Sequence, residues 1–420
     1  MDLLFKNIHA LTLAADAPVL RNAFVGVTGP RISYLSQEAP AEAATRTIDG
    51  HGGVLMPGLH NAHTHAAMTL LRGYANDAAL ETWLFDHIFP AEEKMEAIPG
   101  AIRTGTLLAM AEMLASGTTS FNDMYSPLEP IAQAVDEAGM KANLSNAVLT
   151  FDNNYNLREG DCFRETMGLL TSFARRPHGR ITVQAGLHAV YTSTPRVWRQ
   201  VAEWAATEGL HLHTHLSETR TEHENCLRQY GLTPTAALAS HGVFDVPALA
   251  AHACWVTDAD MDLLARHGVT VAHNPVSNAK LASGIAPVTQ MRARGVNVAL
   301  GTDGAASNNT LDLFEEIKWA SLLQKLHTGD PTALPALEVL KMATPHRLEV
   351  GADADMALVR LDAPSQVPCH DIPAALAFAT TGKDVCMTLC QGRVLYENGR
   401  FPTIDIEKVM ADARQMAAQL

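Results

Sequence analysis

The feature that most constrains the fold is a regular alternation of short apolar runs with amphipathic, helix-like segments between residues 53 and 343. Such runs predict buried strands, and segments such as "TPRVWRQVAEWAATEG", which end in glycine, are typical of helices. We expect eight strands, at residues 53–60, 118–123, 141–148, 181–188, 210–217, 248–252, 269–273 and 296–303. Eight strand-helix units over about 290 residues favour an α/β fold of the TIM (β/α)8 barrel type. A doubly wound open sheet is the competing topology.

The two ends of the chain have a different pattern. Residues 1–52 and 348–400 hold short alternating runs and turns, such as "FVGVTGPRISYLS" and "GRVLYENGRF", and no convincing helix precedes residues 405–420. Alternation of apolar and polar residues indicates half-buried strands. We expect both ends to pair in one small β-domain, with residues 1–56 as its first part, the barrel at 57–345, and residues 346–420 as its second part plus a C-terminal helix.

Composition excludes several classes of function. The chain has 31 Lys and Arg against 45 Asp and Glu, a net charge of −14, which disfavours nucleic acid as a partner. Its start does not resemble a signal peptide, and no run reaches the about 18 apolar residues that a membrane-spanning helix needs. The six scattered cysteines are typical of reduced thiols. We expect a cytoplasmic protein that acts on a small molecule and has no membrane partner.

Polar residues follow the expected strands at the end where a TIM barrel carries its active site. These residues are His63, His65, His188, His215, His252, His273 and Asp303. Residues i and i+2 lie on one face of a strand, so His63 and His65 can hold one ion together. His215 and Asp303 would complete the ligand set from across the barrel. Nitrogen and oxygen ligands with one open position suit one divalent metal, zinc first, with iron or manganese as substitutes.

Two further histidines precede His215 on the same strand face. His211 and His213 alternate with it, but only His215 reaches the strand end. We expect the other two to lie deeper in the barrel, without a ligand role.

The residues around these strand ends suit hydrolysis at a heteroaromatic carbon. A bound metal can lower the pKa of its water from about 16 to about 7. Glu218, three residues beyond His215, could protonate a ring nitrogen of the substrate. Asp303 could take a proton from the attacking water and pass it to the leaving group, and His252 could orient the attacking oxygen. Glu218 also fits an ordinary solvated helix start, because "SET" is a good N-terminal helix signal.

Five motifs follow one another along the chain: "MPGLHNAHTHAAMTLLRG", "THLSET", "AAHACW", "HNPVSNAKLASGIAP" and "VALGTDGAASNN". In this order they resemble the amidohydrolase superfamily, and specifically its 5-methylthioadenosine/S-adenosylhomocysteine deaminase branch. The resemblance extends from "LLFKNIHALTL" to "VLYENGRF". It implies a (β/α)8 barrel with a small composite β-sandwich formed by both chain ends, one divalent metal, and hydrolytic loss of ammonia from an adenine ring.

The resemblance also implies roles position by position. The metal ligands would be His63, His65, His215 and Asp303, and Glu218 and His252 would handle protons. No lysine follows the fourth strand, where relatives with two metals carry a bridging one, and this agrees with a single metal.

Other matches concern the substrate. Glu92 in "FPAEEKM" matches a glutamate that holds the ribose hydroxyls, and His188 matches a histidine that contacts the substrate. Asn146 stands where some relatives place an arginine for the amino-acid carboxylate of S-adenosylhomocysteine. Either Arg158 or Arg164 would have to compensate for it.

The expected activity is deamination of a nucleoside, 5-methylthioadenosine first, with S-adenosylhomocysteine or adenosine as further substrates. One alternative is a related aminohydrolase or chlorohydrolase of another N-heterocycle, such as guanine, a pterin or a triazine. Another is a barrel that binds a nucleoside or a metal without turnover. The Glu218 and His252 pair argues against both, because loss of a poor leaving group requires protonation of the ring. Homo-oligomers are common in the superfamily, but no segment of this sequence predicts an interface.

Overall fold

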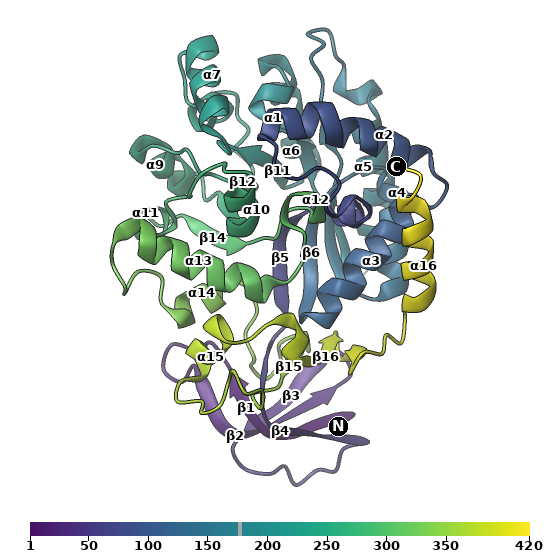
Figure 1. Ribbon diagram of the computed structural model, residues 1–420, viewed down its shortest axis with the longest axis vertical. Coiled ribbons are helices and arrows are strands. Elements are labelled where there is room, and N and C mark those ends of the chain that lie inside the picture. Colours follow the sequence, from purple (N-terminus) through teal and green to yellow (C-terminus); the bar gives the residue numbers. More distant parts are fainter. Residues whose placement is uncertain (175–178) are drawn as a thin grey trace.

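A barrel of strands and helices lies above a smaller sheet (Figure 1). The structure, a computed structural model, describes residues 1–174 and 179–420. The barrel strands are β5 (Leu59–Thr64), β6 (Thr118–Met124), β7 (Lys141–Ser145), β8 (Ala147–Val148), β9 (Ile181–Val183), β10 (Ala185–Leu187), β11 (Leu212–Leu216), β12 (Ala248–His252), β13 (Thr270–His273) and β14 (Asn297–Leu300).

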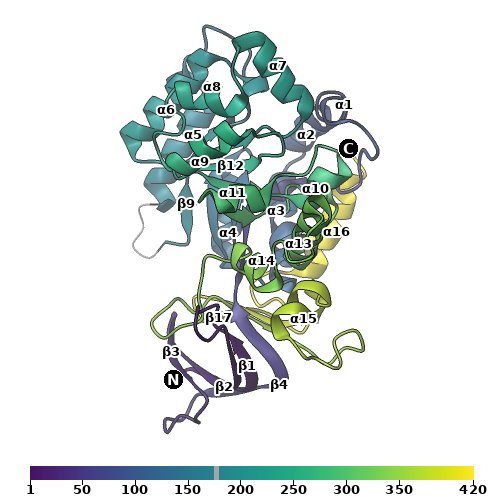
Figure 2. The same cartoon turned by 90° about the vertical axis from the view of Figure 1, so that its left-hand side faces the viewer.

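Helices cover the outside and the C-terminal end of the barrel (Figure 2). They are α1 (Leu80–Thr82), α2 (Phe89–Ala97), α3 (Ala101–Ala115), α4 (Leu128–Ala138), α5 (Asp161–Leu169), α6 (Pro195–Glu208), α7 (Arg220–Tyr230), α8 (Pro234–Ser240), α9 (Asp258–Arg266), α10 (Pro275–Lys280), α11 (Val288–Ala293), α12 (Ala305–Asn308), α13 (Leu313–Thr328) and α14 (Ala336–Met342). α4 and α6 end in left-handed glycines, Gly139 and Gly209. Within the described ranges, no helix is long and apolar enough to cross a membrane.

The barrel strands pair in parallel in two arcs, ordered β5-β6-β7-β9 and β14-β13-β12-β11-β10-β8. β7 and β8 are two parts of one expected strand, interrupted at Asn146, and β9 and β10 are two parts of the next, interrupted at Gln184. These two strands therefore belong to both arcs and link them. On the other side, the segment after β14 meets β5 through a backbone hydrogen bond of 2.9 Å from Asp303 N to His63 O. The architecture is the expected TIM-type barrel, with a seam there in place of a strand ladder.

A bulge in β5 turns neighbouring side chains toward the barrel interior. Residues 62 and 63 of β5 lie opposite the single residue 122 of β6. Ala62 belongs to a small buried cluster with Leu249, Ala251 and Ala272, and the ring of His63 contacts that of His213. Successive residues of a regular strand face opposite sides, so the extra residue is what allows both to face inward.

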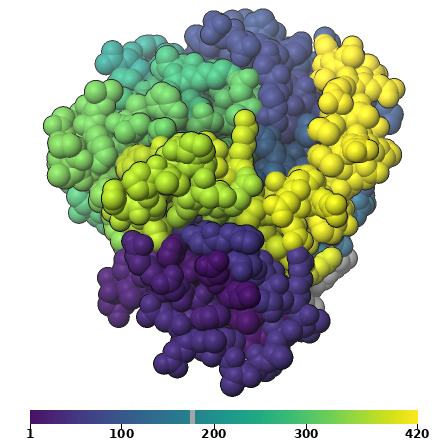
Figure 3. All heavy atoms as spheres, turned by 60° about the horizontal axis from the view of Figure 1, so that its bottom comes forward, coloured from purple at the N-terminus to yellow at the C-terminus, as the bar shows by residue number. Residues whose placement is uncertain are grey.

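Both chain ends form one seven-stranded mixed sheet, ordered β17-β16-β15-β4-β1-β2-β3. Its strands are β1 (Leu3–Leu11), β2 (Val19–Thr28), β3 (Arg31–Ser36), β4 (Arg46–Pro57), β15 (Met356–Val359), β16 (Val385–Cys390) and β17 (Arg393–Glu397). Figure 3 shows the N-terminal residues in purple directly beside C-terminal residues in green and yellow. The strands belong to one sheet, so a sandwich of two packed sheets stays a prediction.

Two more helices belong to the C-terminal part of the chain. α15 (Ile372–Phe378) contacts α14, and α16 (Ile406–Ala417) packs along α3 on the side of the barrel (Figure 1). Val409 and Ala413 are the buried residues of α16. The C-terminal helix therefore covers the barrel and not the small sheet.

One expected barrel strand, residues 53–60, is two strands in the structure. β4 ends at Pro57 and pairs with β1 and β15 in the small sheet, whereas β5 begins at Leu59 and pairs with β6. Between them, a Cβ at Gly58 would lie 2.3 Å from Oγ1 of Thr119, so the chain passes from sheet to barrel where only glycine fits. The apolar pattern runs through this point because the residues on both sides of it are buried.

Lys141 joins the barrel to the small sheet. Its Nζ lies 2.6 Å from Oδ2 of Asp353 and 2.5 Å from Oδ2 of Asp355. The side chain of Asp355 is only 1% exposed, and Lys141 is its cationic partner.

We predict that Lys141→Ala lowers the free energy of unfolding by about 3 kcal/mol, because it leaves a buried carboxylate unpaired. Urea denaturation measures the loss. The control is Lys408→Ala, which breaks the exposed pair with Asp412 and should cost only about 0.5 kcal/mol. Equal losses in the two variants would contradict a special role for the Lys141 junction.

Candidate active site

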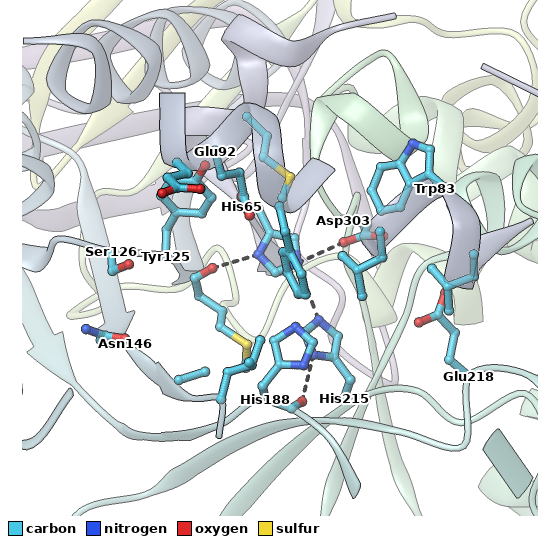
Figure 4. A pocket seen from close by; sticks show the side chains of 18 of the residues that line it. His65, Trp83, Glu92, Tyr125, Ser126, Asn146, His188, His215, Glu218 and Asp303 are labelled. Atoms are coloured by element: carbon cyan, nitrogen blue, oxygen red, sulfur yellow. Dashed lines mark hydrogen bonds and ion pairs between the residues drawn. The ribbon is translucent and has the colours of Figure 1, made fainter. Parts of the chain in front are cut away.

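Four side chains that the sequence predicts as a group converge at the C-terminal end of the barrel. His63 and His65 come from the end of β5, His215 from β11 and Asp303 from the segment after β14. The Nε2 atoms of His63 and His65 lie 3.4 and 3.3 Å from Oδ1 of Asp303. The Nε2 atoms of His65 and His215 lie 3.3 Å apart, and Figure 4 shows these two rings facing each other with Asp303 alongside. The structure therefore brings all four together.

Backbone carbonyls orient two of the imidazoles. Nδ1 of His65 lies 2.6 Å from the carbonyl oxygen of Met124, and Nδ1 of His215 lies 2.8 Å from that of His188 (Figure 4). A carbonyl oxygen can only accept, so each Nδ1 carries a hydrogen. In the neutral ring the lone pair then belongs to Nε2, the atom that faces the other ligands.

Two serines donate hydrogen bonds to one oxygen of the Asp303 side chain. Its Oδ2 accepts hydrogen bonds from Ser277 at 2.7 Å and Ser307 at 2.8 Å, which leaves Oδ1 for the histidines. Burial opposes ionisation, but His63 and His65 outweigh it and hold the pKa of Asp303 well below its usual value. Burial lowers the pKa of His63 to about 4. At His65 burial acts in the same direction, but Asp303 overcomes it and raises the pKa to about 9.

The donor set fits a divalent metal. Nε2 of His63 is buried and has no hydrogen-bond partner among the described residues. Its neighbours are imidazole nitrogens and a carboxylate oxygen, and the ligand atoms of His63, His65 and Asp303 lie within 4.8 Å of one another. Buried polar atoms are rarely left unpaired, and three nitrogens with one oxygen are donors that zinc accepts. The orphaned lone pair and its surroundings therefore suit a cation.

Glu218 and His252 lie beside this group. Oε1 of Glu218 accepts a hydrogen bond of 3.0 Å from Ser283, and Oε2 lies 3.7 Å from Nε2 of His252. Glu218 is 4% exposed, so the alternative of a solvated helix start is wrong. Burial raises the pKa of Glu218, which lets this carboxyl hold a proton nearer neutrality. The carboxylate of Glu222 accepts a hydrogen bond of 2.7 Å from the backbone N–H of Glu218. Oδ1 of Asn278 lies 2.8 Å from Nδ1 of His252.

A pocket of about 350 Å³ opens onto this group (Figure 4). Its apolar wall includes Met68, Leu80, Trp83, Leu84, Phe89, Ile102 and Leu281. Glu92 on α2, Tyr125, Asn146 and His188 supply polar atoms. Burial raises the pKa of Glu92, and the neighbouring hydroxyl of Tyr125 opposes this rise only in part. An apolar cleft with a few polar groups suits a small aromatic ligand.

The structure does not bring Arg158 and Arg164 into the pocket. Arg158 is exposed, with its guanidinium 5.6 Å from the centre of the Phe163 ring. Arg164 is also exposed and is paired with Asp161. The expectation that one of them compensates for Asn146 is therefore corrected, because local partners hold both away.

The pocket wall is instead neutral or acidic around Asn146. Nδ2 of Asn146 donates to Glu165 at 3.0 Å. The described residues that line the pocket include Glu92, Glu93 and Glu96 but no lysine or arginine. An anionic group on a ligand would find no lysine or arginine partner among these lining residues.

Four other histidines near the barrel strands lie outside the set of four ligand-type side chains. His213 contacts His63 below the four ligands, and His211 lines a second cavity of about 360 Å³, which also includes His60 from the start of β5. His273 is buried at the end of β13, and neither of its ring nitrogens has a hydrogen-bond partner among the described residues.

Sequence reasoning missed three serines that bond to the acidic groups of the site, Ser277, Ser283 and Ser307. All three lie inside the last two of the five motifs. That position is the only signal in the sequence that could have pointed to them.

Comparisons with known proteins agree with this geometry. A model of the amidohydrolase family matches residues 54–395. The chain belongs to the amidohydrolase family. A 5'-deoxyadenosine deaminase of Methanosarcina acetivorans is 43% identical to this amidohydrolase over 100% of the chain and 98% of its own length. A 5-methylthioadenosine/S-adenosylhomocysteine deaminase of Thermoanaerobacter pseudethanolicus is 39% identical over 100% and 99%.

A solved structure is similar over the same extent. The crystal structure of an adenosine deaminase from Xanthomonas campestris with bound zinc has a TM-score of 0.92 and 32% identity to this amidohydrolase. The match covers 100% of this chain and 98% of that chain. The resemblance stated from the five motifs is therefore confirmed.

We predict that zinc raises the melting temperature of the metal-stripped amidohydrolase, because a ligand of the folded state alone stabilises it. At a free zinc concentration about 100 times Kd the gain is about 2.7 kcal/mol. His63→Ala should abolish the shift, as measured by scanning calorimetry together with metal analysis. The control is His273→Ala, which removes a histidine of equal burial outside the ligand set. If the control also loses the zinc response, or His63→Ala keeps it, the assignment of ligands is wrong.

Proposed function

We propose that this amidohydrolase is a zinc-dependent deaminase of adenosines with an uncharged 5′ substituent, and that it releases ammonia and leaves the inosine analogue. The observation that carries the proposal is the position of Glu218 and His252 beside the four ligand-type side chains, at the floor of an apolar pocket. Relatives named as deaminases of such nucleosides are about 40% identical over the full chain, which supports the same chemistry.

In this proposal His63, His65, His215 and Asp303 hold the metal. A divalent ion there would act as a Lewis acid and make water a nucleophile at neutral pH. Oδ1 of Asp303 is the basic atom nearest the ligand nitrogens, because both serines occupy Oδ2. Asp303 accepts the proton that the attacking water loses and later passes it to the departing nitrogen.

Glu218 supplies the acid. Its Oε1 is engaged by Ser283, so Oε2 is the oxygen that carries the proton to a ring nitrogen of the purine. Protonation of the ring lets water add to the carbon that bears the amino group. The C–N bond of that carbon then breaks, and ammonia leaves with the proton returned from Asp303. The added hydroxyl loses its remaining proton to Glu218, which forms the carbonyl and restores the acid. Nε2 of His252, 3.7 Å from Glu218, orients the attacking oxygen.

The pocket walls set the substrate. In this proposal Glu92 accepts hydrogen bonds from the ribose hydroxyls, and His188 contacts the base. The apolar wall around Trp83 and Leu84 packs on the ring and a methylthio group. The charge of the wall disfavours an amino-acid carboxylate, since glutamates line it without a lysine or arginine among the described residues.

The experiment that tests the proposal is ammonia release by purified zinc-loaded enzyme. The panel is 5-methylthioadenosine, 5′-deoxyadenosine, adenosine, S-adenosylhomocysteine, guanine and a chlorotriazine. We predict kcat/KM above about 10⁴ M⁻¹s⁻¹ for the first two. S-adenosylhomocysteine should be at least about tenfold slower, because its carboxylate meets acidic side chains. Activity confined to guanine or the triazine would overturn the proposal.

Asn146 offers a specific check of the charge argument. Asn146→Arg places a cation in the pocket wall and should raise the activity on S-adenosylhomocysteine relative to 5-methylthioadenosine. Asn146→Gln, which changes size without charge, should leave the ratio unchanged. A similar ratio in both variants would remove Asn146 from substrate selection.

We predict that Glu218→Gln keeps the bound metal but lowers kcat by about 10² to 10⁴, because an amide cannot transfer the proton. Metal analysis and steady-state kinetics on the same preparation measure the two effects. The control is Glu224→Gln, a neighbouring exposed glutamate that should leave both unchanged. Loss of metal in Glu218→Gln would mean that this residue is a ligand and not the acid.

A further inference from the structure

His213 lies directly behind one of the four ligand residues. Its Nε2 is 2.9 Å from Nδ1 of His63, and the two rings cross at 81°. Both side chains are completely buried, so no solvent competes for this contact. A neutral imidazole has one N–H, so one ring must donate and the other accept. The direction of this bond decides which nitrogen of His63 keeps a lone pair.

The hydrogen-bond partner of the other ring nitrogen of His213 settles that direction. Nδ1 of His213 lies 3.2 Å from Oγ of Ser145, and Ser145 donates its own hydrogen to the carbonyl oxygen of Asp123 at 3.0 Å. That carbonyl can only accept, and a hydroxyl has only one hydrogen. Oγ of Ser145 is therefore the acceptor for Nδ1–H of His213. It follows that Nε2 of His213 accepts from Nδ1–H of His63.

We propose that His213 and Ser145 form a positioning relay that fixes His63 in the tautomer whose Nε2 lone pair faces Asp303, His65 and His215. The proposal rests on the metal site of the proposed function. The opposite direction of the relay would put a hydrogen on Nε2 of His63, 3.4 Å from Oδ1 of Asp303. His63 and Asp303 would then hydrogen-bond to each other, and these two atoms could not both bind a metal.

This relay differs from the support of the other two histidines. His65 and His215 bond to backbone carbonyls, which accept whatever the side chains around them are. The partner of His63 is another imidazole, which can donate or accept depending on what its far nitrogen meets. The tautomer of His63 therefore depends on the hydroxyl of Ser145, which acts on it through His213.

The test measures tautomer and metal affinity without substrate. Long-range ¹⁵N NMR of the metal-stripped full chain, with signals assigned through His63→Ala and His213→Ala, should show His63 and His213 both protonated at Nδ1. Ser145→Ala should give a mixture of tautomers at His63 and weaken zinc binding by about 10- to 100-fold in a chelator competition. Ser145→Thr keeps the hydroxyl and should restore both.

Ser321→Ala is the matched control. Ser321 is equally buried and also donates to a carbonyl, that of Leu334, but it lies on α13 without a link to a histidine. A general loss of a buried hydroxyl would affect both alanine variants alike, and only the relay predicts an effect limited to Ser145→Ala. Wild-type zinc affinity in Ser145→Ala overturns the proposal. So does Nε2 protonation of His63 in the stripped wild type, a measurement that stands even if the variant does not fold.

An inactive but zinc-binding protein would contradict the proposed deaminase function and leave the relay intact. An active deaminase whose zinc affinity is unchanged by Ser145→Ala would contradict the relay and leave the proposed function intact. The two failures are therefore distinguishable.

Discussion

The hydrogen bond from Asp303 N to His63 O is the interaction on which the site depends. It joins β5 to the segment that follows β14, at the level of two of the side chains that we propose as metal ligands. A Cβ at Gly301 would lie 2.7 Å from the backbone nitrogen of His63, so the two segments meet this closely only because that position is glycine. The bulge in β5 then aims His63 inward. Seam, glycine and bulge together bring the carboxylate of Asp303 within reach of the histidines.

The site balances burial against charge. Among the ligand-type residues, burial favours neutral rings at His63 and His215, whereas His65 and Asp303 form a charged contact. Neutral imidazole is the form that binds a metal, so only His65 must give up a proton when a cation enters. Glu218, beside this contact, has a hydroxyl partner of its own in Ser283. Separate partners therefore let two acidic side chains lie close together in one small volume.

Much of the barrel could be predicted because periodicity is local. The runs at 118–123 and 248–252 coincide with β6 and β12 within one residue. The run at 53–60 reads as one strand because no composition change marks Gly58, whose role depends on the distant contact with Thr119. The bulge in β5 is likewise a matter of pairing with β6, which the sequence of β5 does not contain.

Residues of the site were predictable where chemistry and position coincide. Histidines that recur at successive strand ends point to a shared metal ion, and His63, His65 and His215 do converge. Serines are common everywhere, so Ser277 carried no signal until the fold placed it against Asp303. Charge alone made the two arginines, Arg158 and Arg164, candidates for the pocket, and sequence does not show that local partners hold them outside it.

The small sheet has a consequence for the order in which the molecule is made. Strand β4 pairs on one side with β1, but its other side waits for β15, where Met56 meets Ala357 about three hundred residues later. At a synthesis rate of about 5 to 20 residues per second, that edge stays open for about 15 to 60 s. Open strand edges invite pairing with other chains. The nascent N-terminal segment is thus exposed to aggregation until β15 emerges and covers this edge.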